Sequence, residues 1–266
     1  MKWILEIPGC ISSMLRLKQI CLVAADLDPV EEDLKAIFGL EVAFSDPGLS
    51  QFGLRNIMLP IGNSFLEVVT PIQENTTAGR FLERRGGDGG YMVILQCGDI
   101  GEMTERVQSL GIRIVWQDSN DETSGIQLHP KDLPGALVDI RRNSGDQSPD
   151  GPWSPAGPDW QRARRTDIVH SLAAAEIQSD DPDALAARWS EVTERPVSRD
   201  ADHNPEVRLD DGSIRFVKAN DGRGIGLGGI DVEVVDRARL LAAAEARGRK
   251  VSDGEVMICG ARIRLV

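Results

Sequence analysis

The chain has few of the residues that build disulfide scaffolds, thiolate metal sites or membrane spans. It contains four cysteines in 266 residues, and no two of them form a Cys-x-x-Cys pair. Three of the four, Cys21, Cys97 and Cys259, lie in or beside apolar runs, which indicates buried, reduced thiols in a cytoplasmic protein. No segment approaches the roughly 20 consecutive apolar residues of a membrane-spanning helix. A disulfide-stapled fold and a helical membrane protein are therefore both excluded.

Basic charge is also scarce. Thirty Lys and Arg residues face 42 Asp and Glu residues, for a formal net charge of −12, which argues against a protein that binds a nucleic-acid backbone. The first residues contain Glu6 and Pro8 where a signal peptide would be uninterrupted and apolar. With 41% hydrophobic residues, a chain of this length can bury a substantial core and divide into two domains.

A short pattern recurs along the chain: a strand-like apolar run, an acidic turn and then a helical run. Its four copies open at Gln19–Asp28, Gly90–Ile100, Asp167–Asp181 and Gly228–Asp236. Alignment of the turn acids makes four positions equivalent, namely Gln19, Met92, Leu172 and Gly229. The period is that of a βαβββ unit and is too long for the common solenoids.

Helix and strand signals repeat within each copy. Helices are expected at 28–39, 79–85, 101–110, 183–193 and 237–247. In the first copy, strands are expected at 41–45, 56–60 and 64–70, and the later copies contain similar runs. Helices that alternate with several antiparallel strands predict an α+β fold.

The composition changes between the second and third copies. Ser144–Pro152 and Pro155–Pro158 are too rich in Gly, Pro and Ser to continue a helix or a ladder, so 144–165 is predicted to be a linker. The predicted organisation is an extension at 1–14, a first domain at 15–143 and a second domain at 166–266. Trp153 and Trp160 are too apolar for a free tether and are predicted to pin the linker onto a domain surface, with stacking on a ligand as the lesser alternative.

These features resemble the glyoxalase or vicinal-oxygen-chelate superfamily, and residues 17–142 are most similar to its methylmalonyl-CoA epimerase-like branch. The resemblance rests on four segments in order: Gln19–Asp28, Gly62–Pro71, Phe81–Glu83 and Leu128–Asp139. It implies two glyoxalase-like half-open barrels, each formed by two βαβββ units. Residues 166–266 resemble a second, degenerate copy.

In that superfamily, four inward-facing positions on the strands hold a divalent metal. Carried over, these positions are Gln19, Glu67, Met92 and Asp139. Glu67 and Asp139 each interrupt an apolar strand, where a buried carboxylate is costly unless it is paired or binds a cation. The alternative is that both acids face solvent on a half-exposed sheet.

The expected ligand set departs from the family, which usually has histidine where this chain has Gln19 and Met92. A thioether is a poor ligand for a hard cation. The predicted metal ligands are therefore Gln19, Glu67 and Asp139, an oxygen set suited to Mg²⁺ or Mn²⁺ and not to zinc or iron. The equal alternative is that no metal is bound.

Other candidates for the first cavity are substrate contacts. They are Cys21, Phe65, Met92, Ile94, His129 and Arg80. Pro130 and Pro134 flank the turn that contains His129, which favours a structural role for this histidine. Arg80 could meet a phosphate or carboxylate, or merely balance neighbouring acids.

The equivalent positions of the second domain are predicted to be Leu172, Phe216 or Arg215, Gly229 and Arg264, a set that cannot hold a metal. Gly222–Gly229 resembles a phosphate loop but leads into a strand, so it is expected to be a connection.

The residues and the family resemblance together leave two possible functions. The first is a lyase or isomerase in which Glu67 and Asp139, as base and acid, move a proton beside the carbonyl of a small 2-oxo, 2-hydroxy or acyl-thioester compound. The second is a metal-free protein that binds or sequesters a small apolar molecule. Both imply a small-molecule ligand, with no nucleic acid or membrane partner, and a monomer or homodimer, since one barrel can pack on the other within the chain.

Overall fold

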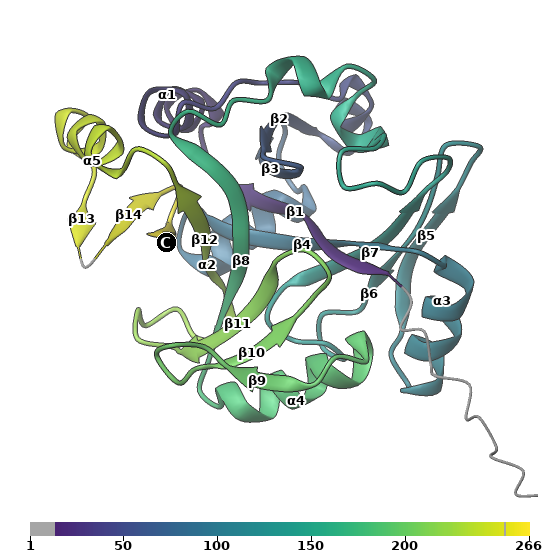
Figure 1. Cartoon of the computed structure of the whole chain (residues 1–266). Helices are drawn as coiled ribbons and strands as arrows, with labels where there is room; N and C mark the ends of the chain where they lie inside the picture. Colours follow the sequence, from purple (N-terminus) through teal and green to yellow (C-terminus); the bar gives the residue numbers. More distant parts are fainter. Residues whose placement is uncertain (1–13, 253) are drawn as a thin grey trace, which may run out of the picture.

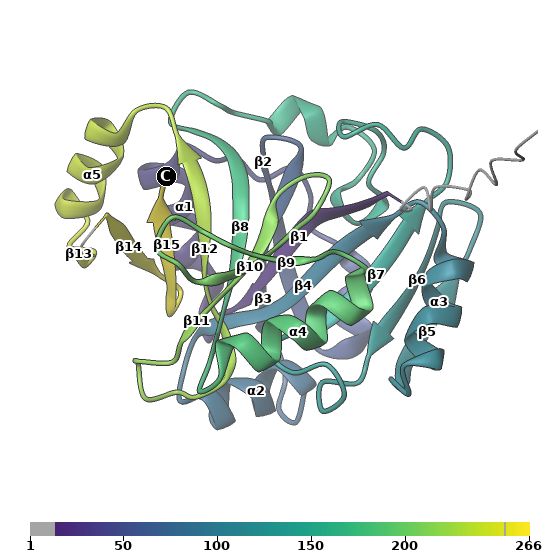
Figure 2. The same cartoon turned by 60° about the horizontal axis from the view of Figure 1, so that its bottom comes forward.

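The computed structural model describes residues 14–252 and 254–266, so the predicted extension at 1–14 lies outside the described residues except for Met14. The described chain forms two mixed β-sheets that lie side by side, with helices on their outer surfaces (Figures 1 and 2). The predicted α+β class and the two glyoxalase-like halves are confirmed.

The first sheet has seven strands in the order β2-β3-β1-β4-β7-β6-β5. Its strands are β1 (Leu15–Val23), β2 (Leu54–Ile61), β3 (Ser64–Pro71), β4 (Gly89–Cys97), β5 (Ile114–Ser119), β6 (Thr123–Leu128) and β7 (Leu137–Asn143). Its helices are α1 (Leu27–Phe38), α2 (Thr77–Arg85) and α3 (Ile100–Ser109), with the 3₁₀ turn η1 (Pro47–Phe52) before β2. Strand β1 pairs parallel with β3 and antiparallel with β4, which in turn pairs parallel with β7.

The second sheet has eight strands in the order β13-β14-β15-β12-β8-β11-β10-β9. Its strands are β8 (Val169–Ser179), β9 (Val197–Arg199), β10 (Pro205–Arg208), β11 (Ser213–Lys218), β12 (Gly226–Val234), β13 (Val251–Ser252), β14 (Glu255–Ile258) and β15 (Ala261–Leu265). Its helices are α4 (Pro182–Thr193) and α5 (Arg237–Ala246). The pairing of β8 with β11 and β12 repeats that of β1 with β3 and β4, so both sheets follow one plan.

One predicted strand is wrong. The run at 41–45 forms a single isolated bridge between Phe44 and Met58, and the first unit has two strands after its helix where the others have three. Asp46-Pro47 immediately starts η1, because the Asp46 carboxylate accepts the Gly48 N–H and proline suits the first turn. In the fourth unit, β13 has two residues.

The recurring acidic turn is the start of a helix in all four units. Asp26, Asp99, Asp181 and Asp236 are the N-caps of α1, α3, α4 and α5, and each side chain accepts a backbone N–H of the first turn. The residue seven positions before Asp181 is Ala174. The predicted counterpart Leu172 is therefore wrong by two residues.

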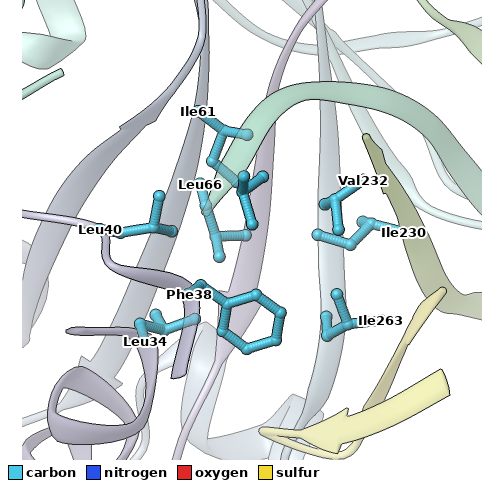
Figure 3. Close-up of a pocket in the computed structure, with 9 residues that line it drawn as sticks. Leu34, Phe38, Leu40, Ile61, Leu66, Ile230, Val232 and Ile263 are labelled. Carbon is cyan, nitrogen blue, oxygen red and sulfur yellow. The ribbon is translucent and has the colours of Figure 1, made fainter. Parts of the chain in front are cut away.

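The two sheets share one apolar core. Helix α1 and strands β2 and β3 face β12 and β15 across the gap that Figure 3 shows, through side chains that include Phe38, Leu66 and Ile230. The volume left there is about 10 Å³, no more than one water molecule needs. The barrels thus pack closely against each other. Among the described residues, no helix is both long and apolar enough to cross a bilayer.

Candidate active site

The candidate site lies on the face of β3, β1, β4 and β7 that is turned away from the shared core. Pairing register places one row of side chains across these strands: Phe65, Gln19, Ile94 and Asp139. The next row on the same face contains Glu67, Cys21 and Met92. Because side chains alternate along a strand, residues two apart share a face. The strands therefore bring seven of the predicted site residues onto one surface.

Glu67 is the centre of a hydrogen-bonded cluster on this surface. Its Oε2 accepts the amide of Gln19 at 2.8 Å, and its Oε1 accepts the amide of Asn56 at 2.6 Å. Burial raises the pKa of Glu67, while the hydrogen bonds from Asn56, Cys21 and Gln19 oppose that rise. The residue keeps some contact with solvent, as does Met92 beside it. Glu67 is thus a partly buried residue whose carboxyl has a raised pKa.

Asp139 lies on the same face but has a different partner. It is 3% exposed and contacts the Arg141 guanidinium at 3.2 and 3.3 Å, and Arg141 also pairs with Asp118 at 3.0 Å. Burial raises the pKa of Asp139, and Arg141 opposes it. Two strands separate Asp139 from Glu67, a distance of ~14 Å along the sheet at ordinary strand spacing. In the described structure, no hydrogen bond joins the two carboxyls.

The predicted substrate contacts divide into two groups. Cys21, Phe65 and Ile94 are buried and Met92 is partly buried, all within one apolar cluster on the candidate face. His129 lies in the turn after β6, where its Nδ1 accepts the Lys131 N–H at 3.1 Å. Arg80 is exposed on α2 and donates to the Asn75 carbonyl. The contacts of His129 favour its structural role, and among the described residues the hydrogen bonds of Arg80, to Asn75 and Thr77, include no acid.

The linker covers one side of the face. Trp153 and Trp160 are each 1% exposed and pack on Phe65, with ring centroids 6.4 Å and 4.9 Å from it. The Trp153 Nε1–H donates to Gln19 Oε1 at 2.8 Å. Lys18 fixes the segment from the barrel side, because its Nζ donates to the carbonyl of Pro149 at 2.7 Å and lies 5.3 to 5.8 Å from the three rings. The prediction that both tryptophans pin the linker to a domain is confirmed.

The predicted metal ligands do not converge on one point in this structure. The Gln19 carbonyl oxygen, its only atom suited to a hard cation, is bonded to the Trp153 indole, and its amide nitrogen faces Glu67. Asp139 is held by Arg141. No group of three His, Cys, Asp or Glu side chains converges for a metal within 14–252 and 254–266. In this arrangement, Gln19, Glu67 and Asp139 do not fit Mg²⁺ or Mn²⁺.

The same face of the second barrel carries a network of ion pairs. Arg215 is 4% exposed and contacts Glu176 at 2.6 Å and Asp231 at 2.7 Å. Register makes Arg215 the counterpart of Glu67, whereas Phe216 points into the main core against Trp189. Of the two predicted counterparts, Phe216 is therefore wrong. Mutually neutralising charges occupy this face, whereas the same face of the first barrel is apolar around Glu67.

Three residues that hold the candidate site were not predicted from the sequence: Asn56, Trp153 in its contact with Gln19, and Arg141. Asn56 had a usable signal, since it alternates with Met58 on the strand that pairs with β3. Arg141 also had one, because it lies two residues after Asp139 on the same strand. The contact between Trp153 and Gln19 spans 134 residues and had no local signal.

Comparisons with known proteins agree with this architecture. The sequence model of the glyoxalase-like domain family matches residues 16–193. Human mitochondrial methylmalonyl-CoA epimerase is 23% identical over 140 residues, which cover 52% of this chain and 79% of that protein. A hypothetical protein from Staphylococcus aureus superposes with a TM-score of 0.67 at 13% identity, over 95% of this chain and 99% of that one. A 4-hydroxymandelate synthase variant from Streptomyces coelicolor gives a TM-score of 0.62 at 14% identity, over 89% and 76% of the two chains. At these identities, the two structures show a shared fold.

Proposed function

This chain belongs to the glyoxalase-like domain family, and on that premise we propose that its first barrel is an isomerase or lyase. The reaction is proton abstraction from the carbon beside a carbonyl, in a small 2-oxo, 2-hydroxy or acyl-thioester compound. Relatives named methylmalonyl-CoA epimerase support the acyl-thioester class in particular. Glu67 is the proposed base.

The observation that carries the proposal is the setting of Glu67. A general base is most effective when its pKa lies near the working pH, and burial moves the pKa of this carboxyl upward. Amide donors from Asn56 and Gln19 hold both oxygens, so the carboxylate is oriented before a substrate arrives. The residue keeps some contact with solvent, which a substrate would need in order to reach it.

Asp139 is too far from Glu67 to act on the same carbon. It lies on the same face, but β1 and β4 separate the two carboxyls by about 14 Å along the sheet, and Asp139 pairs with Arg141. In the proposed reaction, Glu67 takes the proton from carbon, and the electron pair of the broken C–H bond moves to the carbonyl oxygen as an enolate. The protonated Glu67 then returns a proton to that carbon after exchange with solvent. No step is assigned to a metal.

A test that needs no prior substrate identity is hydrogen exchange in D₂O. Methylmalonyl-CoA, pyruvate and lactate represent the three compound classes, and mass spectrometry follows deuterium at the carbon next to the carbonyl. Wild-type protein should exchange at least one, and Glu67→Gln should abolish the exchange because an amide cannot act as base. Glu83→Gln, an exposed glutamate on α2, is the matched control. Exchange that survives in Glu67→Gln would overturn the assignment.

A metal-free binding protein is the second candidate. The apolar surface around Met92, which keeps some contact with solvent, favours it, since apolar linings suit small apolar ligands. Tryptophan fluorescence can report binding of an apolar probe such as anilinonaphthalene sulfonate. Tight binding that is unchanged in Glu67→Gln, with no exchange by wild type, would favour this candidate over the enzyme.

A further inference from the structure

The segment between the barrels contacts the proposed site through one polar atom. Trp153 is 1% exposed and its ring lies nearly parallel to that of Phe65, at an interplanar angle of 11°. Its indole N–H reaches past this contact to the side-chain oxygen of Gln19, at 2.8 Å. The indole N–H of Trp160 instead donates to the carbonyl of Gly151, within the same segment, at 3.3 Å.

The Trp153 hydrogen bond fixes which way the Gln19 amide points. An indole N–H can only donate, so the amide must present its oxygen to Trp153. The amide nitrogen then faces Glu67 Oε2, at 2.8 Å. The reverse orientation would place two donors together at Trp153 and an oxygen against the Glu67 carboxylate. Both contacts therefore select one orientation.

Asn56 shows the same arrangement on the other oxygen of Glu67. Its Nδ2 donates to Glu67 Oε1 at 2.6 Å, and its Oδ1 accepts the backbone N–H of Asp46 at 2.8 Å. Each amide that holds Glu67 is thus oriented by a donor behind it. One of these donors is main chain, and the other is the side chain of Trp153.

We infer that Trp153 is a positioning residue of this site: its indole N–H orients the Gln19 amide, which in turn holds the carboxylate of Glu67. The inference rests on the proposed role of Glu67 and adds a residue from outside the barrel strands to that site. Among the described residues, the Trp153 indole N–H contacts Gln19 and not Glu67, so Trp153 acts on the carboxylate through Gln19.

The consequence is a change in the proton affinity of Glu67 when the indole N–H is removed. A freed Gln19 amide can turn its oxygen toward Glu67, where it accepts from the protonated carboxyl and stabilises that form. The pKa of Glu67 should then rise. The other charged or titratable groups that interact with Glu67 are Asp46, before η1, the thiol of Cys21 on β1 and the phenol of Tyr91 on β4, and none of them changes in this substitution.

The experiment compares Trp153→Phe with Trp160→Phe. Each variant keeps an aromatic ring and loses one indole N–H, so a loss of packing alone would affect both alike. The readout is the pKa of Glu67 from a ¹³C NMR titration of its side-chain carboxyl, assigned by its absence in Glu67→Gln. We expect an upward shift in Trp153→Phe and none in Trp160→Phe. In a Gln19→Leu background, Trp153→Phe should produce no further shift, because the coupling residue is gone.

A second measurement uses the unaltered protein. The indole ¹H–¹⁵N signal of Trp153 should titrate with the midpoint of Glu67, and that of Trp160 should not. Equal Glu67 midpoints in wild type and Trp153→Phe, or equal shifts in both tryptophan variants, would overturn the inference, as would an indole signal of Trp153 that ignores Glu67. These readouts need no substrate, so they remain decisive if the deuterium-exchange test of the proposed function fails.

Discussion

Removing Arg215 should destabilise the second barrel strongly. Its guanidinium bonds to Glu176 at 2.6 Å and to Asp231 at 2.7 and 3.0 Å, and all three side chains are less than a tenth exposed. Arg215→Met keeps the apolar stem but leaves Asp231 without its principal cation, while Glu176 retains Arg262. Loss of one partner from a buried ion pair typically costs about 3–5 kcal/mol. The free energy of unfolding at pH 7 should fall by that order.

Urea unfolding followed by circular dichroism measures this loss, with Arg208→Met as the control. Arg208 pairs with Glu206 on the same barrel but its side chain is 71% exposed, so its substitution should leave the midpoint unchanged. Burial already raises the pKa of Asp231 beside Arg215, and without Arg215 it should rise further. Protonation then relieves the uncompensated charge, so the deficit of Arg215→Met should shrink at pH 5. A deficit below ~1 kcal/mol at pH 7, or one that grows on acidification, would refute the reasoning.

Two further predictions concern pH. Because burial raises the pKa of Glu67 above its ordinary 4.5, the wild type should lose stability as pH rises above that value, and Glu67→Gln should flatten the loss in thermal unfolding between pH 4 and 8. Parallel curves for the two proteins would contradict this. Burial lowers the pKa of Lys18 from 10.5 to about 8, so its contribution is present above 10.5 and is lost as pH falls through 8. Relative to Lys18→Met, the wild type should therefore gain on the order of 3 kcal/mol between pH 8 and 10.5 in chemical unfolding. If this gain is absent, Lys18 is not desolvated in the folded protein.

Local chemistry in the sequence was enough to predict the repeat and the candidate face. A strand that runs into an aspartate and a helix needs only the preference of helix N-termini for short acidic side chains, and all four aspartates are N-caps. Alternation along β3 placed Phe65 and Glu67 on one face, because the side-chain period of a strand is two, and the resemblance to the glyoxalase superfamily implied that Gln19 lies on the same face.

The errors arose where a local signal had two readings. Glu41–Ser45 has the composition of a strand, but Asp46-Pro47 starts a 3₁₀ turn that leaves only a bridge at Phe44. In the third unit, Asp181 is the N-cap of α4, so the counterpart of Gln19 is Ala174, and the assignment of Leu172 was an error of alignment. Choosing between such readings requires the hydrogen-bond partner, and a sequence does not show it.

The partners of the site were decided by tertiary structure alone. The sequence and its family resemblance placed Glu67 and Asp139 on one face. In the fold, two strands lie between them and Asp139 forms an ion pair with Arg141. The fold also brings Trp153 across 134 residues to orient Gln19. Propensity and periodicity act over a few residues, and so they specify which side of a strand a group occupies. Whether a buried carboxyl meets an amide, a guanidinium or another acid depends on which distant segment closes over it, and that is set by packing of the whole chain.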